Sequence, residues 1–67
     1  MASAACFSPE TIRLMRMALD DAWNSLEPEA QATVLKTPLA VRILESASQG
    51  ERDRQRLRDA ALIALAA

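Results

Sequence analysis

The sequence contains no histidine and no tyrosine, and Cys6 is its single cysteine. A disulfide within the chain is therefore impossible, and a zinc finger and every histidine-based catalytic triad are excluded as well. The charges nearly balance, with eight basic against nine acidic residues, so the chain is not a polybasic arm that binds nucleic acid or a membrane through charge alone. We expect no metal, no cofactor and no enzymatic activity, because the groups that such chemistry needs are missing.

Glycine and proline are also scarce, at one and three residues, whereas alanine supplies 14 of the 67. Alanine is the strongest helix former, and glycine and proline oppose helices most, so the composition predicts an all-α fold. Besides alanine there are 19 larger apolar side chains, counting Ile, Leu, Val, Met, Phe and Trp. A core of this size supplies only about 3–5 kcal/mol, so we expect close helix packing through alanine, or oligomerisation.

The prolines mark where helices begin, because proline is well tolerated at the first helical position. Pro9 follows Ser8 and Pro38 follows Thr37, two residues whose hydroxyls can cap a helix N-terminus. We expect the first helix to run from Pro9 to about Leu26. Its apolar residues recur at a spacing of three and four, which predicts a core face; they are Ile12, Met15, Leu19, Ala22 and Leu26, with Trp23 widening the stripe.

A short helix or turn is expected from Pro28 to Leu35, with Val34 and Leu35 buried. The next helix is expected to start at Thr37-Pro38 and to end near Gln49, with Gly50 in the left-handed conformation after it. Its predicted inner face contains Leu39, Ala40, Ile43, Leu44 and Ala47.

The last helix is expected to begin at Glu51 or, if Asp53 caps it, at Arg54. The fold is therefore predicted to be a compact all-α bundle of three main helices with a short additional helix or turn after Pro28. We assign residues 1–7 to a flexible N-terminal segment and residues 8–67 to a single helical domain.

Some apolar residues lie outside the predicted core faces. Leu14 and Met17 project roughly opposite the core stripe of the first helix, and the last two turns of the final helix are apolar on almost every side. If these side chains join, they form an interaction surface. The candidate residues are Leu14, Met17, Val41, Leu62, Ile63 and Leu65. The favoured function is a non-enzymatic helical protein-interaction module that binds a protein partner or itself as a homo-oligomer.

An alternative function is that of a small nucleic-acid-associated regulator. Its candidate phosphate contacts are Arg52, Arg54, Arg56 and Arg58. On a helix these arginines fall on two faces, and Glu51, Asp53 and Asp59 interleave with them. A solvated helix start with salt bridges explains the pattern better than the basic footprint that nucleic-acid binding requires. Nucleic acid is therefore the weaker expectation for a partner.

The chain is not expected to enter a membrane. The closing apolar run, residues 60–67, is eight residues long, whereas a bilayer core requires about 20. The first six residues lack the basic and apolar regions of a signal peptide, so we expect a cytoplasmic location.

Several short segments resemble a group of small uncharacterised all-helical proteins of rhizobia and related alphaproteobacteria. These segments are Phe7-Ser8-Pro9-Glu10, Ala18-Leu19-Asp20-Asp21-Ala22-Trp23, Val41-Arg42-Ile43-Leu44, Gly50-Glu51-Arg52-Asp53 and Leu57-Arg58-Asp59-Ala60-Ala61-Leu62. The resemblance covers nearly the whole chain after Cys6. It implies the helical architecture and a bacterial cytoplasmic setting, and it assigns no functional residue.

Overall fold

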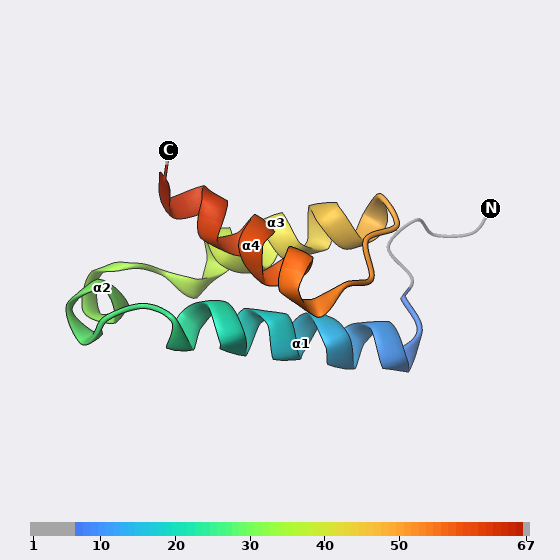
Figure 1. Ribbon diagram of the computed structural model, residues 1–67, viewed down its shortest axis with the longest axis horizontal. Coiled ribbons are helices and arrows are strands. Elements are labelled where there is room, and N and C mark those ends of the chain that lie inside the picture. The colour runs from blue at the N-terminus through green and yellow to red at the C-terminus, as the bar shows by residue number, and fades with distance from the viewer. Residues whose placement is uncertain (1–6, 67) are drawn as a thin grey trace.

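The computed structural model describes residues 7–66, with side chains for residues 7–65. Apart from Phe7, the expected flexible N-terminal segment, including Cys6, lies outside these residues. The helices are α1 (Pro9–Asn24), α2 (Pro28–Thr33), α3 (Lys36–Ser48) and α4 (Arg54–Ala66). Between residues 7 and 66 there is no strand, so the predicted all-α bundle of three main helices and one short helix is confirmed (Figure 1).

The three long helices all pack against one another. The α3–α4 and α1–α4 contacts are more extensive than the α1–α3 contact. Helices α1 and α3 run in opposite directions, and α2 lies at the end where α1 stops and α3 begins (Figure 1). In this part of the chain, no helix has both the length and the apolar character needed to cross a bilayer.

The core is small and rich in alanine. Its buried apolar residues are Ala18 and Ala22 of α1, Leu39, Ile43 and Ala47 of α3, and Leu57 and Ala61 of α4. Four of these seven are alanines. Because the side chains at a helix crossing set the distance between the axes, alanine lets the helices approach closely. This is the mode of packing expected from the composition.

The predicted start of α1 is confirmed. Ser8 Oγ accepts a hydrogen bond from the backbone N–H of Thr11 at 3.1 Å, and the Ser8 and Thr11 hydroxyls are 2.9 Å apart. Pro9 occupies the first helical position. Phe7 packs against the core, which directs the chain into the helix.

The junction between α3 and α4 also agrees with the prediction from the sequence. Gly50 has φ +103°, and the Gly50 and Glu51 amides donate to the carbonyls of Ala47 and Ser46, each at 3.0 Å. This pair of hydrogen bonds is a Schellman motif, which ends α3. Asp53 Oδ1 then accepts from the backbone amides of the second and third residues of α4, at 2.8 and 3.2 Å, so of the two predicted starts the one capped by Asp53 is correct.

Two expectations around the start of α3 are wrong. Helix α3 begins at Lys36, before Thr37, and the residue at its N-cap position, Leu35, provides no side-chain cap. Thr37 therefore lies exposed in the first turn instead of capping it. Leu35 is 71% exposed and Val34 is only half-buried, because α2 ends at Thr33 and the next two residues are extended backbone.

Candidate interaction surface

The apolar arc of α1 is centred on two alanines, Ala18 and Ala22, both fully buried. Larger apolar side chains lie on both sides of this line. On one side Leu14 is half-buried and packs against the core. Met17, three residues further on, is also half-buried, and its sulfur lies 3.8 Å from a guanidinium nitrogen of Arg54 in α4. Helix α4 therefore covers this side of α1.

An ion pair holds α4 at this position. Arg54 Nη2 donates to Asp21 Oδ1 at 2.9 Å, and Arg54 Nε donates to the second carboxylate oxygen. The hydrogen bonds from Arg54 lower the pKa of Asp21 despite partial desolvation, and the charges of Arg54 and Arg58 lower it further. The same contact raises the pKa of Arg54. Two helices far apart in the sequence are thus joined by a bidentate contact.

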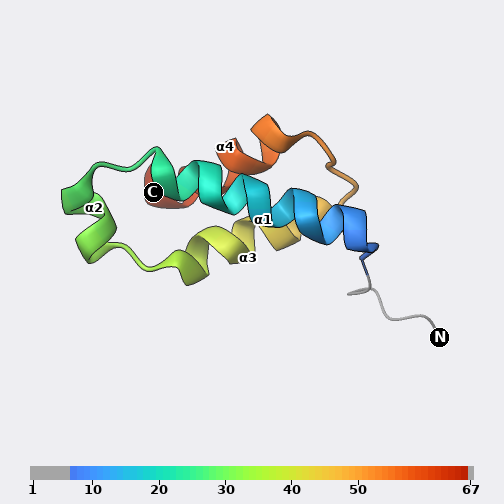
Figure 2. The same cartoon turned by 90° about the horizontal axis from the view of Figure 1, so that it is seen from below.

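On the other side of α1, an open apolar groove of about 190 Å³ lies along the contact between α1 and α3. The two helices lie side by side in Figure 2. The groove is lined by Ile12, Met15, Arg16 and Leu19 of α1 and by Ala40, Ile43 and Leu44 of α3. Arg16 is the only charged residue in this lining. Ile43 is buried and forms the floor, while Ile12 and Leu44 remain 40% and 46% exposed.

Val41 extends this apolar surface along α3. It precedes Leu44 by three residues, so the two are neighbours on the helix, and it is 44% exposed. We call the resulting surface the α1/α3 face. It consists of Ile12, Met15, Leu19, Ala40, Val41 and Leu44, with Arg16 at its edge.

Sequence periodicity assigned most of this surface to the core, and for two residues that prediction is wrong. Ile12 was expected on the core face of α1 and Leu44 on the inner face of α3, yet both are exposed. The reason is that the apolar arcs of α1 and α3 are each wider than the area that the neighbouring helices cover. The helices close on Ala18 and Ala22, where small side chains allow the nearest approach, and the bulky flank is left open.

Not all of the six residues predicted to form an interaction surface are exposed in the structure. Leu14 and Leu62 pack against the core, and Met17 is half-buried. The exposed members are Val41, Ile63 and Leu65. Ile63 is two residues from buried Ala61, so it lies on nearly the opposite side of α4 and is separated from Val41.

The four arginines of the alternative hypothesis all have partners within the chain. Arg52 donates to the carbonyl oxygens of Ala47 and Glu51, at 2.7 and 2.8 Å, and lies 6.0 Å from the ring centroid of Phe7. It therefore stabilises the end of α3 and the loop that follows.

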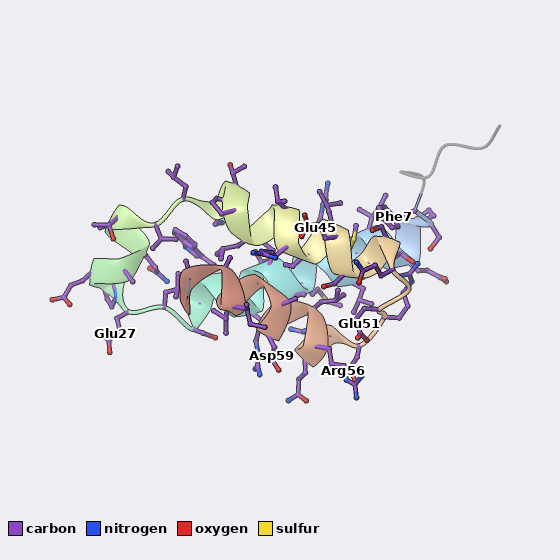
Figure 3. The ribbon with its side chains drawn as sticks, turned by 90° about the horizontal axis from the view of Figure 1, so that it is seen from above. Phe7, Glu27, Glu45, Glu51, Arg56 and Asp59 are labelled. Carbon is purple, nitrogen blue, oxygen red and sulfur yellow. The ribbon has the colours of Figure 1, made fainter. Side chains whose placement is uncertain are left out.

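The other three arginines face carboxylates. Arg54 pairs with Asp21, Arg56 with Glu51 at 3.9 Å and Arg58 with Asp59 at 3.0 Å. Glu51, Arg56 and Asp59 are labelled in Figure 3, where they lie along the loop before α4 and the first part of that helix. Each of these positive charges is already partly neutralised, which weakens the case for a phosphate-binding surface.

Among the described side chains, no three His, Cys, Asp or Glu residues come together in a way that could hold a metal ion. The chain matches no protein-family model, no curated protein and no solved structure. The resemblance to alphaproteobacterial proteins remains a prediction.

Proposed function

We propose that this protein is a non-enzymatic helical interaction module that associates with a second copy of itself through the α1/α3 face. The observation that carries the proposal is the exposure of three large apolar side chains, Ile12, Val41 and Leu44, beside a groove with an almost wholly apolar lining. Single exposed apolar residues are ordinary on protein surfaces, but a surface shared by two helices favours a docking site.

The size of the chain supports the same proposal. Seven buried apolar residues, mostly alanine, provide little hydrophobic stabilisation for a chain of 67 residues. Covering the α1/α3 face would remove additional apolar area from water, at roughly 25 cal/mol per Å². Association therefore supplies stability that the small core lacks.

The charges around the face favour a second copy over a partner of strong charge. Arg16 borders the face on α1, and Glu45 lies on α3 one turn after Val41. The face thus carries both signs, and the whole chain has a net charge of only −1. Two copies can meet there without strong repulsion, whereas a highly acidic or basic partner would find no matching surface.

The test is a matched pair of glutamate substitutions. Leu44→Glu places a charge on the α1/α3 face, and Ile63→Glu places the same charge on a more exposed apolar position of α4. We expect light-scattering mass on a size-exclusion column to show a dimer for the unmodified protein and for Ile63→Glu. Leu44→Glu should weaken the dimer at least tenfold, because a buried charge without a partner is costly.

Circular dichroism supplies the folding control, since both variants should keep the helical spectrum of the unmodified protein. Val41→Glu, on the same face, should repeat the effect of Leu44→Glu. An unmodified protein that stays monomeric at all accessible concentrations would contradict the proposal. So would a Leu44→Glu variant that dimerises normally.

A further inference from the structure

We infer that the two copies meet with α1 of each over α3 of the other, and that opposite charges on the two edges of the α1/α3 face select this pairing. The inference rests on the self-association proposed above. It specifies which helices are in contact in the dimer and which residues determine the register between them.

The two edges of the face differ in charge. On α1, Arg16 lines the groove and Arg13 lies one turn before it, and both are exposed. On α3, the exposed carboxylate of Glu45 follows Val41 by four residues and therefore lies on the same side of the helix. Figure 3 labels Glu45 on α3.

Glu45 is free to change partners. Within the chain, its Oε1 is 3.7 Å from Arg42 Nη1, and the two side chains are each at least half exposed. An exposed ion pair of this kind contributes little and is readily exchanged for another.

Helices α1 and α3 run antiparallel, so the first half of α1 lies beside the second half of α3 (Figure 1). Arg16 belongs to the first of these segments, and Glu45 belongs to the second. The later half of α1 carries Asp20, and the start of α3 carries Lys36. At the level of Arg16 and Glu45 the α1 edge and the α3 edge carry charges of opposite sign, whereas Lys36 lies over the ring of Trp23, 5.1 Å from its centroid.

Two copies can place their α1/α3 faces together in two symmetric arrangements, and these arrangements bring different residues into contact. With a two-fold axis parallel to the helices, α1 of one copy lies over α3 of the second copy, and every residue keeps its position along the helix direction. Arg16 therefore approaches Glu45 of the second copy. A two-fold axis across the helices places α1 over α1 and α3 over α3, and when the axis lies at the level of Arg16 and Glu45 it brings Arg16 toward Arg16 and Glu45 toward Glu45. Opposite charges favour the first arrangement and like charges oppose the second.

Charge reversal distinguishes the two arrangements. We expect Arg16→Glu and Glu45→Arg each to weaken the dimer about tenfold at low ionic strength, because each substitution sets like charges against each other twice per dimer. The double variant Arg16→Glu/Glu45→Arg restores opposite charges and should dimerise within about threefold of the unmodified protein. Arg56→Glu, an exposed arginine on α4, is the matched control and should leave the dimer unchanged.

Sedimentation equilibrium over a range of concentrations gives the dissociation constants, and circular dichroism confirms that each variant is folded. Single variants that dimerise like the unmodified protein, or a double variant no tighter than the single ones, would overturn the pairing of α1 with α3. Self-association itself would stand in that case. An unmodified protein that is monomeric throughout would overturn both this inference and the proposed function.

Discussion

At the scale of single residues, the contact between Asp21 and Arg54 ties α1 to α4 across 33 positions of sequence. The side chain of Asp21 is 32% exposed and that of Arg54 is 49% exposed, so solvent and salt screen the interaction. Asp21 has a lowered pKa in the folded protein because Arg54 hydrogen-bonds its carboxylate. The unfolded chain therefore binds the proton at a higher pH than the folded one does.

From this difference we predict an acid-dependent loss of stability. The contribution of Asp21 is complete above the ordinary carboxyl pKa of about 3.9 and is lost as the pH falls through the lower folded value. Asp21→Asn should be slightly less stable than the unmodified protein at pH 7, and the difference should shrink at pH 3. Urea unfolding, followed by circular dichroism at pH 7 and at pH 3, measures this difference in stability. An equal difference at the two pH values would contradict the prediction.

Two leucines close together in sequence provide a direct comparison of burial. Leu39 is fully buried in α3, while Leu35, just before that helix, is 71% exposed. Leu39→Ala should cost about 2–5 kcal/mol, which is enough to unfold most of so small a domain. Leu35→Ala should change the unfolding midpoint little. Thermal unfolding of the two variants tests the core, and similar midpoints would show that Leu39 is not a core residue.

At the scale of elements, capping decides where the helices begin and end. Asp53 accepts two backbone hydrogen bonds at the start of α4, whereas Thr37 lies inside the first turn of α3. We predict that Asp53→Ala lowers stability by about 1 kcal/mol and that Thr37→Ala changes it by less than about 0.5 kcal/mol. Urea titration of both variants provides the comparison, and a larger loss for Thr37→Ala would contradict the observed start of α3.

Much of the element structure could be predicted from local sequence. Ser8-Pro9, Gly50 and Asp53 each act through neighbours within a few residues, so their roles follow from short-range chemistry. Thr37 is the exception, because the preceding Lys36 is already helical and the hydroxyl has no terminal amide to cap.

The exposed face could not be predicted in the same way. A helical repeat shows which residues share a side, but not how much of that side the neighbouring helices cover. Helix α1 has an apolar arc wide enough for Leu14 to contact the core and for Ile12 to remain exposed. The buried alanines Ala18 and Ala22 were the available signal, since small residues in the middle of such an arc mark the closest approach of helices.

At the scale of the whole molecule, three helices share a small, alanine-rich core and leave one face apolar and open. The open face contains larger side chains than most of the core. A second copy placed on it would convert Ile12, Val41 and Leu44 from exposed to buried residues. The proposed dimer would thus complete hydrophobic packing that the single chain leaves open.

The most direct test is the mass of the unmodified protein in solution, measured by sedimentation equilibrium from low to high concentration with reductant present. Reductant removes any contribution from a disulfide through Cys6. The chain has a mass of 7.3 kDa, and we predict a reversible rise to twice that value as the concentration increases. A mass that remains at 7.3 kDa over the whole range would contradict self-association through the α1/α3 face.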